Sequence, residues 1–177
     1  MDSPAPQRSR ILVVDDNREI HADFRKLLAG DAAPSESERD GLDALDAIIG
    51  VDAEEVATEQ IFDVDSADQG RKALLMVEAA VAEGRPYSLA FVDMRMPPGW
   101  DGLETIDHLV AVDPRMQIVI CTAYSDHDWD DIHARVGHVD NVLVLKKPFD
   151  AIEARQMAWA LCKKWSLARE SERKQEE

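Results

Sequence analysis

The sequence has little cysteine, no long apolar stretch and a deficit of basic charge. Two cysteines, Cys121 and Cys162, make no disulfide framework, so we expect a reducing compartment with both thiols buried. No stretch approaches the roughly 18 apolar residues of a membrane helix, and the N-terminal residues lack the apolar core of a secretory signal. Asp and Glu number 36 against 20 Lys and Arg, a net charge of −16, which disfavours nucleic acid and anionic membranes as partners. We therefore expect a cytoplasmic protein.

Four short apolar runs organise the chain of 177 residues, at 11–14, 89–92, 118–120 and 142–145. They are continuous and rich in β-branched residues, which is typical of parallel strands covered on both faces. A more polar run at 61–65 predicts an edge strand, and Ser66 after it is the expected N-cap of the next helix. Apolar stripes with helical spacing separate the runs. The alternation predicts an α/β fold with a doubly wound parallel sheet.

The expected domain runs from residue 10 to 150, after a disordered tail at 1–9. Within it, the segment 31–60 holds ten acidic residues against a single arginine, a net charge of −9, and is interpreted as a solvated insertion between the first helix and the edge strand. Residues 151–177 are expected to form a last helix that extends toward a coiled-coil linker, and the final residues 171–177 are expected to be frayed or cut from a longer chain. The 3-4-3 spacing on this helix predicts a coiled-coil seam for a partner or a second copy, formed by Ala158, Leu161, Trp165 and Ala168.

Polar side chains follow four of the apolar runs: Asp15 and Asp16, Asp93, Thr122, and Lys147. The carboxyl ends of parallel strands share one edge of a sheet, and ligands bind in the crevice there. Neighbouring strands lie about 5 Å apart, so the three carboxylates are expected to meet. Close carboxylates repel one another unless a cation lies between them. Oxygen donors without thiolate or imidazole favour Mg²⁺ over zinc.

A carboxylate beside Mg²⁺ and an ammonium group can accept a phosphoryl group, because the cations neutralise the phosphoryl oxygens. Asp93 is the candidate acceptor, since it stands alone at the tip of its strand. Asp15 and Asp16 would hold the ion. Lys147 and the Thr122 hydroxyl would reach the phosphoryl oxygens.

Four segments then carry a family resemblance: ILVVDDN at 11–17, FVDMRMPPGWDG at 91–102, ICTAYS at 120–125 and LKKPF at 145–149. In order and position they resemble the signature blocks of the receiver domain of two-component response regulators, over roughly residues 10–165. The resemblance implies a flavodoxin-like, CheY-like fold with five parallel strands in the order 2-1-3-4-5. It also implies phosphoryl transfer from a sensor histidine kinase or a phosphotransfer protein to an aspartate, followed by slow hydrolysis.

Residue by residue, the resemblance makes Asp93 the phosphoacceptor, Thr122 the switch hydroxyl and Lys147 the phosphate-pairing lysine. Asp15 and Asp16 become the acidic pair. The backbone carbonyl of Arg95 becomes a further ligand of Mg²⁺, for which Mn²⁺ could substitute. A cis peptide bond is implied between Lys147 and Pro148.

The sequence departs from the family pattern in two places besides the insertion. The loop after the acceptor, 96–102, is one residue longer than usual. Val144 occupies the place of the usual aromatic switch residue, and Tyr124 is a possible substitute. These departures leave open a receiver-shaped module that dimerises or binds a partner without taking up phosphate.

A haloacid-dehalogenase-like phosphatase is disfavoured. That family requires an Asp-x-Asp-x-Thr pattern after the first strand, whereas Asn17 and Glu19 follow Asp15 at those places. The expected chemistry is therefore Mg²⁺-dependent self-phosphorylation and slow autodephosphorylation. A downstream output domain or partner protein would read the switch.

Overall fold

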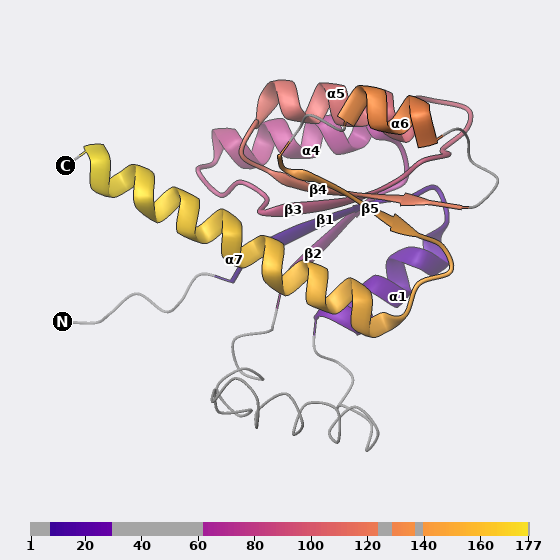
Figure 1. Cartoon of the computed structure of the whole chain (residues 1–177), viewed down its shortest axis with the longest axis horizontal. Coiled ribbons are helices and arrows are strands. Elements are labelled where there is room, and N and C mark those ends of the chain that lie inside the picture. Colours follow the sequence, from indigo (N-terminus) through magenta and orange to yellow (C-terminus); the bar gives the residue numbers. More distant parts are fainter. Residues whose placement is uncertain (1–7, 30–61, 124–128, 137–139, 177) are drawn as a thin grey trace, which may run out of the picture.

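The computed structural model describes residues 8–29, 62–123, 129–136 and 140–176. It contains a sheet of five parallel strands in the order β2-β1-β3-β4-β5 (Figure 1). This confirms the predicted fold class and strand order. The strands are β1 (Arg10–Val14), β2 (Asp63–Ala67), β3 (Leu89–Asp93), β4 (Gln117–Thr122) and β5 (Val142–Lys146).

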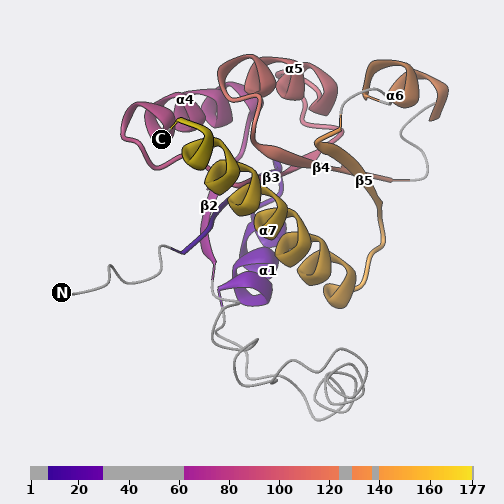
Figure 2. The same ribbon diagram turned by 60° about the vertical axis from the view of Figure 1, so that its left-hand side comes forward.

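Helices cover both faces of this sheet. One face carries α1 (Arg18–Leu28) and α7 (Ala151–Glu176), and the other carries α4 (Gly70–Ala82), α5 (Gly102–Val112) and α6 (Trp129–Val136) (Figures 1 and 2). Successive side chains of a strand point to opposite faces. In β1, Ile11 and Val13 pack with α1 and α7, whereas Leu12 and Val14 pack with the helices opposite. Both faces are buried, which is why the strands read as continuous apolar runs.

The edge strand lies two residues later than the sequence indicated. It spans Asp63–Ala67, so Ser66 pairs with β1 opposite Val13 and does not cap a helix. The N-cap position of α4 is Gln69, whose side chain makes no capping hydrogen bond. Only Ala67 of β2 is buried, and a strand with one buried residue gives little periodicity to read.

The last helix differs from its prediction in two respects. It continues as a helix to Glu176, whereas the sequence analysis expected the final residues to be frayed or cut from a longer chain. The predicted seam is also wrong for Ala158 and Leu161, which are buried against the domain's own core, while Ala168 is exposed. The large apolar side chains that α7 exposes are instead Ile152, Trp159 and Leu167.

Several expectations fall outside the described residues, among them the first residues of the tail, the insertion 31–60 and Tyr124. In the described part of the chain, no helix combines the length and the apolar character required to cross a membrane.

Candidate functional site

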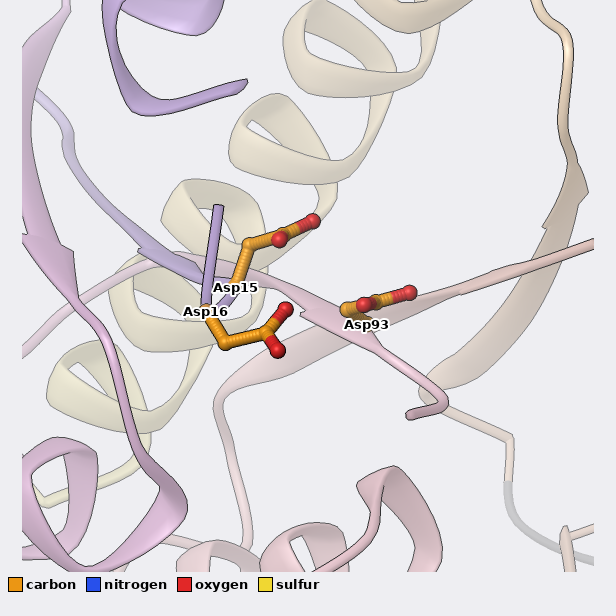
Figure 3. Close-up of side chains that lie close together, drawn as sticks. All are labelled: Asp15, Asp16 and Asp93. Atoms are coloured by element: carbon orange, nitrogen blue, oxygen red, sulfur yellow. The ribbon is translucent and has the colours of Figure 1, made fainter. Parts of the chain in front are cut away.

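Three aspartates meet at the carboxyl edge of the sheet. Asp15 and Asp16 directly follow β1, and Asp93 is the last residue of the neighbouring strand β3 (Figure 3). Each offers one carboxylate oxygen within 4.8 Å of the other two. Asp15 and Asp93 are buried, whereas Asp16 is exposed. The cluster thus has two buried carboxylates and one that faces solvent.

Lys147 lies against the two buried carboxylates. Its Nζ donates to Asp93 Oδ1 at 3.0 Å and lies 3.5 Å from Asp15 Oδ2. The residue follows β5, and its backbone N–H donates to the carbonyl of Thr122 at 2.8 Å. The Lys147–Pro148 peptide is cis, as the family resemblance implies. A side chain from two strands away therefore reaches the tip of β3.

Burial and neighbouring charges shift the pKa values of both Asp93 and Lys147. Burial raises the pKa of Asp93, the hydrogen bond from Lys147 lowers it in part, and the negative charge of Asp15 raises it again. Burial lowers the pKa of Lys147, but the hydrogen bond to Asp93 and the charges of Asp93 and Asp15 outweigh it, so this pKa is raised. Lys147 is therefore a firmly charged counter-ion.

The loop after β1 is held by its own hydrogen bonds. The Asn17 N–H donates to Asp15 Oδ1 at 2.8 Å, and the Asn17 side chain accepts from Glu19 N–H at 3.0 Å as the N-cap of α1. The Asp15 N–H donates to the carbonyl of Ala67 at 3.0 Å. His21 places Nε2 2.6 Å from the carbonyl oxygen of Asp15. The sequence analysis did not select His21, because a contact with a backbone carbonyl leaves no pattern in the sequence.

Thr122 and Arg95 complete the predicted set. Thr122 is buried at the end of β4, one residue past Cys121, the register partner of Asp93. Its hydroxyl donates to the carbonyl of Ala123 at 3.2 Å. Arg95 is exposed in the loop two residues after Asp93. Both therefore lie at the same edge as the carboxylates.

The lengthened loop is closed tightly over the end of β3. The Gly102 N–H donates to the carbonyl of Met94 at 2.9 Å. A Cβ on Gly102 would lie 2.6 Å from the carbonyl oxygen of Asp93, so only glycine permits this approach. Asp101 caps α5, and Trp100 stacks on His108 with ring centroids 4.0 Å apart. The extra residue thus leaves the loop anchored at both ends.

The donor set fits a hard divalent cation. Three carboxylates converge, and the exposed Asp16 gives access from solvent. A Mg²⁺ site needs only one or two direct carboxylates because the ion retains water. One oxygen of Asp15 accepts from Asn17 and the other faces Lys147, so Asp16 and Asp93 are the less encumbered ligands.

The comparison with protein families identifies the family of the chain. The family model described as "Response regulator receiver domain" matches residues 51–158. The chain belongs to this family. The match begins after β1 and α1, so it does not include Asp15 and Asp16; the structure places these two residues beside Asp93.

Solved structures share the receiver fold. One titled adenylate cyclase from Rhodopirellula baltica is 22% identical, with a TM-score of 0.68, and 97% of this chain and 99% of that chain are covered. A response regulator receiver protein from Sinorhizobium medicae WSM419 is 19% identical, with a TM-score of 0.61 and coverage of 91% and 99%. A CheY-like receiver domain protein from Methanospirillum hungatei JF-1 is 15% identical, with a TM-score of 0.64 and coverage of 92% and 99%. At these identities the likeness is one of fold. The comparison with curated proteins gave no match.

Proposed function

We propose that this receiver takes a phosphoryl group onto Asp93 from the phosphohistidine of a sensor histidine kinase or phosphotransfer protein, with Mg²⁺ as cofactor and Mn²⁺ as a substitute. One observation carries the proposal. The Asp93 carboxylate lies at the tip of β3 with an ammonium group 3.0 Å away and two further carboxylates within 4.8 Å. An acceptor, its counter-ion and ligands for a cation therefore occupy one small volume.

In the transfer, a carboxylate oxygen of Asp93 forms a bond to phosphorus while the phosphorus–nitrogen bond of the phosphohistidine breaks. The electron pair stays on the imidazole nitrogen, which becomes available to a proton. Mg²⁺ held by Asp15, Asp16, Asp93 and the carbonyl of Arg95 would neutralise charge on the phosphoryl oxygens. Lys147 would pair with one of these oxygens.

The response is proposed to pass through Thr122. Its hydroxyl donates to the neighbouring Ala123 carbonyl, and a phosphoryl oxygen on Asp93 is a stronger acceptor that would draw it away. Movement of the chain after β4 would then bias the surface formed by α6, β5 and α7 toward an output domain or partner protein. We infer that the protein acts in the cytoplasm and catalyses only its own phosphorylation and slow dephosphorylation.

We also propose a homodimer through α7, in which the contacting residues differ from those of the predicted seam. Ala158 and Leu161 already pack in the core. The helix exposes Ile152, Trp159 and Leu167, of which 52%, 44% and 55% is accessible, and these would form the contact.

Acetyl phosphate with MgCl2 tests the acceptor directly. Intact-mass spectrometry of the wild type should show one added phosphoryl group, and Asp93→Asn should show none, because an amide is not a nucleophile toward phosphorus. Asp113→Asn is the matched control, since Asp113 is also buried but lies at the C-terminal end of α5. Continued labelling of Asp93→Asn would assign the phosphoryl group to another residue.

Val144 favours a second candidate, a receiver that binds its partner without phosphorylation. Its aliphatic side chain stands where the family usually has an aromatic switch residue, and it packs partly buried against the core. The same experiment separates the two functions. A wild type that shows neither a mass gain with acetyl phosphate nor a spectral change with beryllofluoride and MgCl2 would support the binding module.

A further inference from the structure

His21 makes a hydrogen bond to the backbone of the acidic loop. It is the fourth residue of α1 and is partly buried, and its Nε2 lies 2.6 Å from the carbonyl oxygen of Asp15. A carbonyl oxygen can only accept a hydrogen bond, so Nε2 must carry the proton. The imidazole therefore acts as a donor that α1 brings back over the end of β1.

The bond holds the peptide group that joins Asp15 to Asp16. This peptide lies just beyond β1, where the pairing of β1 with β3 has already ended at Val14. A peptide group is planar, so fixing its carbonyl also fixes the direction in which the chain enters Asp16. The bond from Asn17 N–H to Asp15 Oδ1 restrains the turn from its other side.

Asp16 depends on this backbone for its position. Its side chain is exposed, and no hydrogen bond or ion pair with another described residue holds it. One of its carboxylate oxygens nevertheless lies within 4.8 Å of carboxylate oxygens of Asp15 and Asp93. Like charges at this distance repel, so an unrestrained Asp16 would turn toward solvent. Among the described residues, the part of the site that can restrain Asp16 is the peptide on which its side chain stands.

We propose that His21 is a positioning residue for the cation site: by holding the Asp15 carbonyl it keeps the Asp16 carboxylate beside Asp93 and so strengthens Mg²⁺ binding. This inference rests on the proposed function, because it concerns the same site. His21 contacts the backbone of one ligand and no reacting atom. Its contribution is preorganisation, since a cation that finds its ligands already placed does not bear the cost of ordering them.

Calorimetric titration with MgCl2 alone tests the role without a kinase. His21→Ala should weaken Mg²⁺ binding by about three- to tenfold, the effect expected from losing one hydrogen bond. His21→Gln should bind within about twofold of the wild type, because the glutamine amide donates and reaches a similar distance. His133→Ala is the matched control, as His133 is exposed on α6, and it should bind as the wild type does.

The outcomes separate this inference from the proposed function. A wild type that binds no Mg²⁺ overturns both. A wild type that binds Mg²⁺ with a His21→Ala variant of equal affinity overturns only the role of His21, even if urea unfolding shows the variant to be less stable. Equal losses in His21→Ala and His21→Gln also overturn it. If His21→Ala does not fold, His21→Met takes its place, because methionine fills a similar space and donates no hydrogen bond: weakened Mg²⁺ affinity beside a wild-type affinity of His21→Gln supports the role, and unchanged affinity contradicts it.

Discussion

Replacing Lys147 by methionine removes the ammonium group that lies between two buried carboxylates. At an effective dielectric constant of about 20, its attraction is about 5.5 kcal/mol to Asp93 at 3.0 Å and about 4.7 kcal/mol to Asp15 at 3.5 Å. The two carboxylates, at most 4.8 Å apart, repel by at least about 3.5 kcal/mol. Desolvation cancels much of this, and the Lys147 side chain is 27% exposed. We expect a loss of about 3 kcal/mol, the lower end for a broken buried pair.

Urea unfolding at pH 7 in EDTA measures this loss. Lys163→Met is the control, because Lys163 is exposed on α7, and it should change the free energy of unfolding by less than about 0.5 kcal/mol. In an Asp93→Asn background, Lys147→Met should cost about 1–3 kcal/mol less than in the wild type. Additive losses would mean that the 3.0 Å contact contributes nothing to stability.

The pH dependence gives the sign of the effect. The pKa of Asp93 is raised above its ordinary 3.8 by burial, and the hydrogen bond from Lys147 offsets part of this rise. Removing Lys147 should raise the pKa further. A carboxyl group whose pKa is raised by folding contributes stability that is complete below the unfolded pKa and is lost as the pH rises through the folded one. The loss in the free energy of unfolding caused by Lys147→Met should therefore become smaller as the pH falls from 7 toward 4. A loss below about 1 kcal/mol at pH 7, or one that grows in acid, would refute the reasoning.

Two further predictions concern packing and a buried phenol. Gly70→Ala should destabilise the domain by about 1–3 kcal/mol in urea unfolding, because the new Cβ overlaps Thr105 Oγ1 where α4 meets α5. Thr105→Ala should relieve most of that loss, and an equal loss in both backgrounds would exclude the overlap as its cause. Burial, reinforced by the hydrogen bond to Asp65, raises the pKa of Tyr87 above its usual 10.0, so the associated stability is complete below pH 10.0 and is lost progressively as the pH rises from there to the higher folded value. Absorbance at 295 nm should show a late ionisation that Tyr87→Phe removes, and its persistence in that variant would contradict this.

The sheet could be predicted because its strands are covered on both faces. Central strands such as Leu89–Asp93 are buried along their whole length, and such burial produces the continuous apolar run that the sequence shows. Their ends could be predicted for the same reason, since the first polar residue after each run marks the carboxyl edge. The strands, their carboxyl ends and the strand order together predict that Asp15, Asp16 and Asp93 lie close to one another.

The remaining features depend on contacts that spacing does not encode. Ala158 and Leu161 have the spacing of a seam, but a helical stripe does not reveal whether it faces the same chain or another one. Ser66 resembles an N-cap in isolation, yet pairing with β1 places it in an edge strand. The hydrogen bond of His21 is made to a backbone carbonyl, and because every residue has a carbonyl, the sequence does not indicate which one is the partner. Each error arises where the partner of a side chain, and not its type, decides the structure.

The net charge of the site is tolerated in the folded domain but would oppose phosphoryl transfer. Three carboxylates carry a formal charge of −3, and Lys147 reduces it to −2. Two of the carboxylates are buried beside the lysine and the third faces solvent, so the fold tolerates the remaining charge. An aspartyl phosphate carries about two negative charges in place of the single charge of the Asp93 carboxylate, so transfer adds about one more negative charge, which Lys147 cannot also neutralise. A divalent cation with access through Asp16 would supply the missing charge, and for this reason we expect phosphoryl transfer to require Mg²⁺.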